Sequence, residues 1–156
     1  MMRKLRLNII VLIGLCFGAL ALTALSAFAK SDQIYTSWRN QQAVGGYDVV
    51  SFFSGRPMKG DSKISTVWNG ALWQFSTQGN LDAFLDEPQK YAPAYGGYCA
   101  WALAKNKLAK GSPKYWTLKD EVLYLNFNQK IQTRWLNDVE GFIIKGDNNW
   151  PDILGK

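Results

Sequence analysis

The side chains of this sequence that could do chemistry lie in two short segments, each following a pair of glycines. One segment carries Tyr47 and Asp48, and the other carries Tyr98, Cys99 and Trp101. Aromatic rings, a carboxylate and a thiol can together line a pocket for a small ligand. We therefore predict that these five residues form a ligand-binding site.

Cys99 admits several roles. It could be a reactive thiol, a metal ligand or a point of attachment to another molecule, and a reactive thiol needs a pKa lowered by a helix N-terminus or a cation. A free cysteine can equally be a small buried hydrophobic residue. Asp48 has a similar alternative, because an aspartate side chain can cap the start of a helix.

The sequence contains no histidine. This excludes Ser-His-Asp and Cys-His catalysis, histidine general bases and histidine-ligated metals. The lack of a histidine for acid–base chemistry favours a non-catalytic module that binds a small ligand, a metal ion or a partner protein. The alternative is a thiol-dependent enzyme or redox accessory protein that uses Cys99. A third hypothesis is metal binding through oxygen ligands such as Asp48, with or without Cys99.

The first 29 residues have the pattern of a signal peptide. Arg3, Lys4 and Arg6 precede an apolar run over residues 9–25, and residues 27–29 read Ala-Phe-Ala, a cleavage motif. We expect a periplasmic or secreted protein with one domain over residues 30–156 and no membrane span after cleavage. An uncleaved anchor is the alternative, because the run is nearly long enough to cross a bilayer.

Half of the net positive charge comes from this leader. The whole chain carries 18 basic and 12 acidic residues, and removal of the three leader cations lowers the net charge from +6 to +3. A small, scattered charge gives no reason to expect nucleic-acid binding. With only Cys99 left after cleavage, residues 30–156 cannot form an intramolecular disulfide.

The centre of the chain predicts a hairpin followed by a helix. Asn69-Gly70 is a strong turn signal between two β-rich runs at 64–68 and 72–75. Ser76 is the predicted N-cap of a helix whose apolar face carries Leu81, Phe84 and Leu85. Pro88 should end or restart that helix.

A second hairpin and a long helix are predicted further on. Residues 114–118 and 122–127 are β-rich, and Asn128 can cap a helix carrying apolar side chains at Ile131, Trp135, Leu136, Val139 and Phe142. Gly141 and Gly146 could break or end it. Residues 105–114 read as an exposed lysine-rich loop, for which an anionic envelope surface is the alternative partner.

These elements predict an α+β fold: one small domain with two β-hairpins, several short helices and a longer C-terminal helix. Residues 30–46 should form an arm or short helix packed on it. We find no convincing long repeat, and the two hairpin–helix pairs indicate a weak pseudo-symmetry at most. One aromatic set should lie in the core: Trp68, Trp73, Phe75, Phe84 and Tyr91.

The segment from residue 73 to residue 91 resembles the YHS domain. Its pattern of an aromatic residue, Phe75, Phe84, Pro88 and Tyr91 follows the core of that small module. The whole of residues 44–154 is similar to exported, stand-alone YHS domain-containing proteins of bacteria. The further segments that support this are residues 44–50, 90–93, 95–101, 123–126 and 149–151.

The resemblance also shows a departure. Metal-binding members of the family use two cysteine thiolates, which suit zinc or copper. Those two positions fall on Ser76 and Asn80 in this chain. The resemblance therefore implies the YHS-like fold but not the thiolate metal site. It leaves the cofactor open, with a small ligand or an envelope protein as the expected partner.

Overall fold

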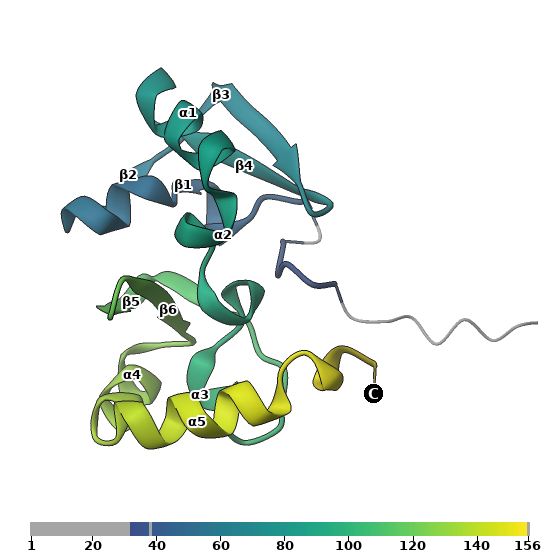
Figure 1. Ribbon diagram of the computed structural model, residues 1–156, viewed down its shortest axis with the longest axis vertical. Coiled ribbons are helices and arrows are strands. Elements are labelled where there is room, and N and C mark those ends of the chain that lie inside the picture. Colours follow the sequence, from purple (N-terminus) through teal and green to yellow (C-terminus); the bar gives the residue numbers. More distant parts are fainter. Residues whose placement is uncertain (1–31, 38, 156) are drawn as a thin grey trace, which may run out of the picture.

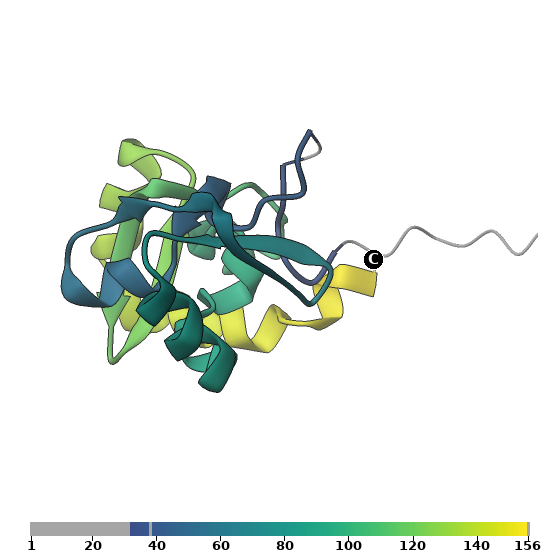
Figure 2. The ribbon, with the colours of Figure 1, turned by 90° about the horizontal axis from the view of Figure 1, so that it is seen from above.

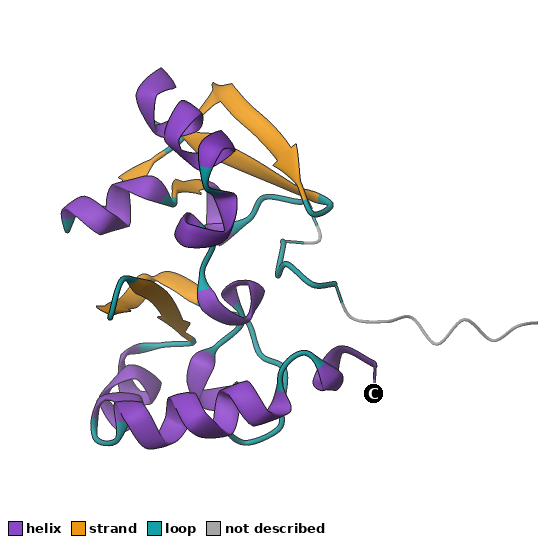
Figure 3. Ribbon diagram, viewed as in Figure 1, coloured by secondary structure: helices purple, strands orange, loops and turns teal. Residues whose placement is uncertain are grey.

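The computed structural model describes residues 32–37 and 39–155. The predicted signal peptide and Trp38 lie outside these residues. Figure 1 shows two halves, one above the other, with the N-terminal half at the top. Each half combines a β-hairpin with helices, as Figure 3 shows by its colours. The predicted α+β class is confirmed, and within the described residues no helix is long and apolar enough to span a bilayer.

The first unit, residues 44–86, starts with the one-turn 3-10 helix η1 (Val44–Gly46) and the short strand β1 (Tyr47–Asp48). The 3-10 helix η2 (Val50–Ser54) leads to β2 (Met58–Lys59), which pairs with β1. The hairpin β3 (Asp61–Trp68) and β4 (Ala71–Phe75) then precedes α1 (Gln78–Asp86). A short helix, α2 (Pro88–Tyr91), restarts at the proline as predicted and leads out of the unit.

The second unit, residues 95–137, repeats this order, except that an isolated bridge between Tyr98 and Lys110 stands in place of the β1–β2 pair. The 3-10 helix η3 (Ala94–Gly97) is followed by α3 (Ala100–Leu103), the hairpin β5 (Ser112–Lys119) and β6 (Val122–Asn126), and α4 (Gln129–Leu136). The chain ends with α5 (Val139–Asn149) and the turn η4 (Asp152–Gly155). Ser112 and Pro113, which we expected in an exposed loop, lie instead at the start of β5.

Local signals explain the first hairpin and its helix. Asn69 and Gly70 have φ values of 47° and 75°, the left-handed pair that a type I′ turn requires. The predicted hairpin is therefore confirmed. The predicted cap is wrong by one residue: Thr77, not Ser76, accepts the Asn80 amide at 3.1 Å. Ser76 is occupied elsewhere, as described below.

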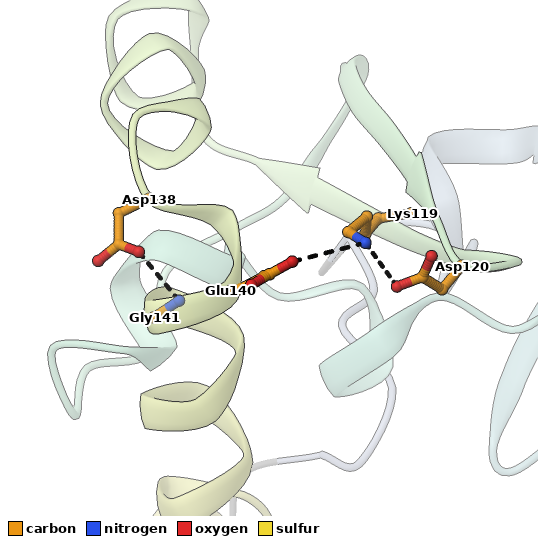
Figure 4. A network of polar contacts seen from close by, with 5 residues as sticks. All are labelled: Lys119, Asp120, Asp138, Glu140 and Gly141. Carbon is orange, nitrogen blue, oxygen red and sulfur yellow. Dashed lines mark hydrogen bonds and ion pairs between the residues drawn. The ribbon is translucent and has the colours of Figure 1, made fainter.

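The predicted C-terminal helix is two helices, α4 and α5. Asn128 caps α4 by accepting the Ile131 amide at 2.9 Å, as expected. Asp138 then caps α5 by accepting the Gly141 amide at 3.1 Å, so the chain starts again where we expected continuity. Figure 4 shows this cap beside Lys119, whose ammonium lies 2.7 Å from Asp120 and 3.9 Å from Glu140.

The two units match residue by residue at a constant offset of 51 positions. In the first hairpin Trp68 pairs with Ala71, and in the second Lys119 pairs with Val122. Both hairpins carry a register irregularity at the same place, between Asp61 and Ser65 and between Ser112 and Trp116. The pseudo-symmetry is therefore much stronger than we expected. Identical residues at this offset include Gly45/Gly96, Gly46/Gly97, Tyr47/Tyr98, Lys59/Lys110 and Gly60/Gly111.

The buried side chains form two core clusters with equivalent aromatic contacts, and the first cluster also takes in Leu123 and Leu125 of β6 from the second unit. The rings of Trp73 and Phe84 lie 4.9 Å apart in the first unit, and those of Tyr124 and Trp135 lie 5.2 Å apart in the second. The aromatic set predicted for the core is confirmed, although Trp68 and Tyr91 are only partly buried. Phe52 packs edge-on against Trp116 at 5.5 Å and so joins the two units.

The N-terminal arm connects both units. The amide of Tyr35 donates to Gly96 at 2.9 Å, and the Tyr98 hydroxyl donates to the Asp32 carbonyl at 2.9 Å. A side chain at Gly96 would collide with Gln33, so this crossing requires glycine. Further on, Ala43 and Leu72 are joined by a backbone hydrogen bond at 2.9 Å. The arm thus crosses the second unit before entering the first, on the side where the C-terminal turn lies (Figure 2).

Candidate functional site

Asp48 is fully buried and makes five hydrogen bonds. One carboxylate oxygen, Oδ1, accepts the amides of Val50 at 3.0 Å and Ser51 at 3.3 Å. The other, Oδ2, accepts the Ser76 amide at 2.8 Å, the Ser76 hydroxyl at 2.6 Å and the Asn80 side-chain amide at 2.6 Å. Asp48 therefore joins the start of η2 to the start of α1, and its predicted capping role is confirmed.

This arrangement, which we call the Asp48 cluster (Asp48, Ser51, Ser76 and Asn80), does not fit a metal ion. A cation needs free lone pairs, but N–H and O–H donors already occupy both carboxylate oxygens. Ser76 and Asn80, at the positions of the family's cysteines, turn their donors toward Asp48. Within the described part of the chain, no group of three or more histidine, cysteine, aspartate or glutamate residues is placed to hold a metal.

Cys99 is the counterpart of Asp48 in the second unit, and it lines a cavity of about 220 Å³. Trp101 and Ala102 contribute to the wall from α3, and Phe127 and Ile131 contribute from the end of β6 and from α4. We call this cavity the Cys99 pocket; its lining residues are Cys99, Trp101, Ala102, Ala109, Phe127 and Ile131. Its walls are apolar apart from the thiol.

The two sites occupy the same place in the two units. The Asp48 carboxylate accepts the backbone amides of Val50, Ser51 and Ser76. The backbone groups that hydrogen-bond the Cys99 sulfur belong to the residues 51 positions later, Trp101, Ala102 and Phe127. The backbone is therefore retained, while the side chains that close the first site are replaced. Phe127 stands at the position equivalent to Ser76, and Ile131 stands at the position equivalent to Asn80.

The thiol environment is that of an unreactive cysteine. Cys99 is 1% exposed, and its sulfur lies 3.7 Å from Oδ1 of Asn126, to which it donates. Burial raises the pKa of the thiol above its ordinary value, and the backbone hydrogen bonds act in the opposite direction. A nucleophilic cysteine needs a lowered pKa. The geometry therefore favours the buried role over the thiol-dependent enzyme.

Asn126 has an unusual position behind Cys99. Its side chain is fully buried, and Nδ2 has no hydrogen-bond partner among the described residues. A buried donor without a partner costs about 1–3 kcal/mol. The first unit has Phe75 at the position equivalent to Asn126. The buried polar side chain therefore stands at position 48 in the first unit and at position 126 in the second.

Only some of the predicted site residues lie together. Cys99 and Trp101 line one pocket. Tyr98 is buried against Tyr35 and Trp150. The other two belong to the first unit, where Lys59 lies 4.1 Å from the Tyr47 ring centre and Asp48 is enclosed as described.

Phe127 and Ile131 are pocket residues that the sequence prediction missed. Each has an apolar side chain that suits either a core or a pocket wall, so composition alone does not distinguish them. A signal was nevertheless present. The Gly-Gly-Tyr sequences at 45–47 and 96–98 set the offset of 51 residues, and this offset carries Ser76 and Asn80 onto Phe127 and Ile131.

A larger cavity of about 310 Å³ lies where the two units meet. It includes Trp68, Lys90, Glu121 and Trp150 but none of the five predicted residues. Its charged groups have both signs, and Lys90 is already paired with Glu87 at 3.1 Å. These mixed charges do not indicate one chemical class of ligand for this cavity.

The comparison with family models supports a YHS-domain protein. The model of the YHS domain matches residues 49–95, which span the first unit from the residue after Asp48 to the beginning of the second. No curated protein and no solved structure matches the chain at a significant level. The match thus covers the unit whose site is closed, and the unit with the open pocket lies beyond it.

Proposed function

We propose that this protein is an exported, non-catalytic binding module of the YHS type, and that the Cys99 pocket is its ligand site. The observation that carries the proposal is the contrast between equivalent places in the two units. Five hydrogen bonds close the first. The second keeps the same backbone but leaves an apolar cavity.

The shape of the pocket supports binding of a small apolar group. Phe127, on its wall, is 41% exposed, so the pocket has an aromatic face that solvent reaches. An apolar cavity of about 150 Å³ is enough to bind benzene, and such cavities hold water poorly. A volume of about 220 Å³ therefore suits a ring or a short hydrocarbon chain.

Export is supported by the leader pattern of residues 1–29. The test is the intact mass of the protein recovered from the cell envelope or medium. The expected mass is that of a chain that begins at Lys30. Retention of the whole leader in a membrane fraction would replace export with anchoring.

Ligand binding is tested by thermal unfolding of the natural protein with octan-1-ol as the probe. Binding to the folded state raises Tm with probe concentration. The double variant Phe127→Ser, Ile131→Asn places first-unit residues in the wall and should abolish the rise. A Tm that does not respond to the probe in the unaltered protein would overturn the pocket as a site for apolar groups.

A further inference from the structure

Two lysines contact aromatic residues of the Cys99 pocket without being among its lining residues; Lys105 also lies 5.6 Å from the Phe142 ring centre, and Lys110 lines a second cavity that shares Phe127. The ammonium of Lys105 is 5.7 Å from the ring centre of Trp101, and that of Lys110 is 5.4 Å from the ring centre of Phe127. Ammonium groups at these distances are attracted by the ring faces, which holds them near the pocket. The apolar cavity therefore has cationic groups beside it.

Within the part of the chain that the structure describes, these lysines have no acidic partner. Between Cys99 and Ser112 the chain has Lys105, Lys107 and Lys110 but no aspartate or glutamate. Among the described residues, no carboxylate lies within 4.0 Å of any of the three ammonium groups. Elsewhere in the same unit Lys119 is paired with Asp120 at 2.7 Å. The ammonium groups near the pocket are therefore available to an anionic ligand.

The first unit again supplies the contrast. Lys59 is the counterpart of Lys110, and its ammonium donates to the Gly45 carbonyl at 2.9 Å while lying over the Tyr47 ring. No comparable oxygen partner is found for the Lys110 ammonium in the described residues. In the unit whose site is closed, the Lys59 ammonium has an oxygen acceptor as well as a ring contact. In the unit whose site is open, the contact found for the Lys110 ammonium among the described residues is with the Phe127 ring.

From this geometry we infer that the Cys99 pocket binds a small anionic amphiphile: a free carboxylate with a short hydrocarbon or aromatic tail. The tail occupies the apolar cavity, and the carboxylate lies at its mouth within reach of Lys105 and Lys110. This inference rests on the proposed function, because it names the chemical class of the ligand for the same pocket. Apolar walls supply affinity for the tail, and the two ammonium groups discriminate the head group.

The test compares probes that differ only in the head group. Calorimetric titration of the natural protein with octanoate, octan-1-ol and octylamine, each below its aggregation concentration, gives three dissociation constants. Octanoate should bind about tenfold more tightly than octan-1-ol, and octylamine most weakly. The preference for octanoate should decrease as salt is added, since exposed charges are screened.

Variants locate the head group. Lys105→Gln with Lys110→Gln should weaken octanoate about three- to tenfold and leave octan-1-ol unchanged. Lys63→Gln, an exposed lysine of β3, is the matched control and should alter neither constant. Equal binding of octanoate and octan-1-ol would overturn the carboxylate preference while the proposed pocket stands. No binding of any probe would overturn both.

Discussion

The Asp48 cluster and the Cys99 pocket show what one backbone arrangement can do with two sets of side chains. In both units the chain turns through three left-handed residues, forms a short helix, and returns by a hairpin to a capped helix. In the first unit a buried carboxylate meets five donors. In the second, an uncharged thiol sits beside apolar residues and a cavity. The difference lies in the side chains, above all at the equivalent positions 48/99, 51/102, 75/126, 76/127 and 80/131.

The comparison of the two sites indicates which one contributes to stability and which one is suited to binding. A buried carboxylate is tolerated only when donors surround it, so the first site must remain closed to keep its charge satisfied. The second site has no charge to satisfy and can remain open. The comparison therefore favours a mainly structural role for the first unit's site and is consistent with the binding role that we propose for the second.

The largest effect is expected from Asp48→Ala. The substitution leaves the donors of Ser76, Asn80 and two backbone amides without their acceptor, at a cost of about 4–5 kcal/mol. The counterpart Cys99→Ala should cost only about 1–2 kcal/mol, because one sulfur atom and a weak hydrogen bond are lost. Urea unfolding of both variants measures the difference. Equal losses would contradict the structural role of Asp48.

If Asp48→Ala does not fold, Ser76→Ala gives the same comparison with a smaller change. It removes one hydroxyl donor at 2.6 Å from the carboxylate and keeps the backbone bond, so the loss should be about 1.5–2 kcal/mol. Phe127→Ala, the matched change in the second unit, should cost less than about 1 kcal/mol because its ring is partly exposed. Urea midpoints at constant slope report both values, and a costlier Phe127→Ala would reverse the assignment.

The dependence of stability on pH should also distinguish the units. Burial raises the pKa of the Cys99 thiol in the folded state, whereas the unfolded thiol ionises near its ordinary value of about 8.5. The folded state therefore loses stability relative to the unfolded state as pH rises above about 8.5, by at most about 1.4 kcal/mol per pH unit.

The measurement is the unfolding free energy of the natural protein and of Cys99→Ala between pH 7 and pH 9.5. The difference between them should change with pH in the alkaline half of this range and stay constant near neutrality. A constant difference throughout would mean that the thiol is not shielded from water.

The smallest effect is expected from Asn126→Leu. The substitution removes a buried donor that has no partner in the described part of the chain. Removal of this donor offsets the lost contact with Cys99, so stability should change by less than about 1 kcal/mol. Chemical unfolding provides the measurement. A loss well above this value would show that Nδ2 has a partner, such as a buried water.

Much of the fold was predictable because its signals are local. Asn69-Gly70 specifies its turn, and Asn128 specifies its cap, from the chemistry of one or two residues. The break between α4 and α5 was missed because the apolar spacing runs through it. There Asp138 ends the longer pattern by capping a new helix. Gly146, expected to end the helix, lies inside it, and a side chain there would collide with Tyr95.

The candidate site was predictable only in part. Cys99 and Asp48 could be named from their chemistry, but their equivalence depends on the repeat, whose identities are sparse and scattered from Gly45/Gly96 to Leu85/Leu136. The partners of Asp48 are distant in sequence: Asn80 lies 32 positions later. Such contacts are set by how β4 and α1 pack, which no local pattern encodes.

The arm over residues 32–36 has a mechanical consequence. It is fastened to the second unit by Tyr35 and Tyr98 before the chain enters the first. A force applied at the N-terminal end would therefore load the C-terminal half of the molecule first. The hydrogen bond between Tyr35 and Gly96 lies nearer to the point of loading than the hydrogen bonds of Asp48, so it is the first of these contacts to carry the force.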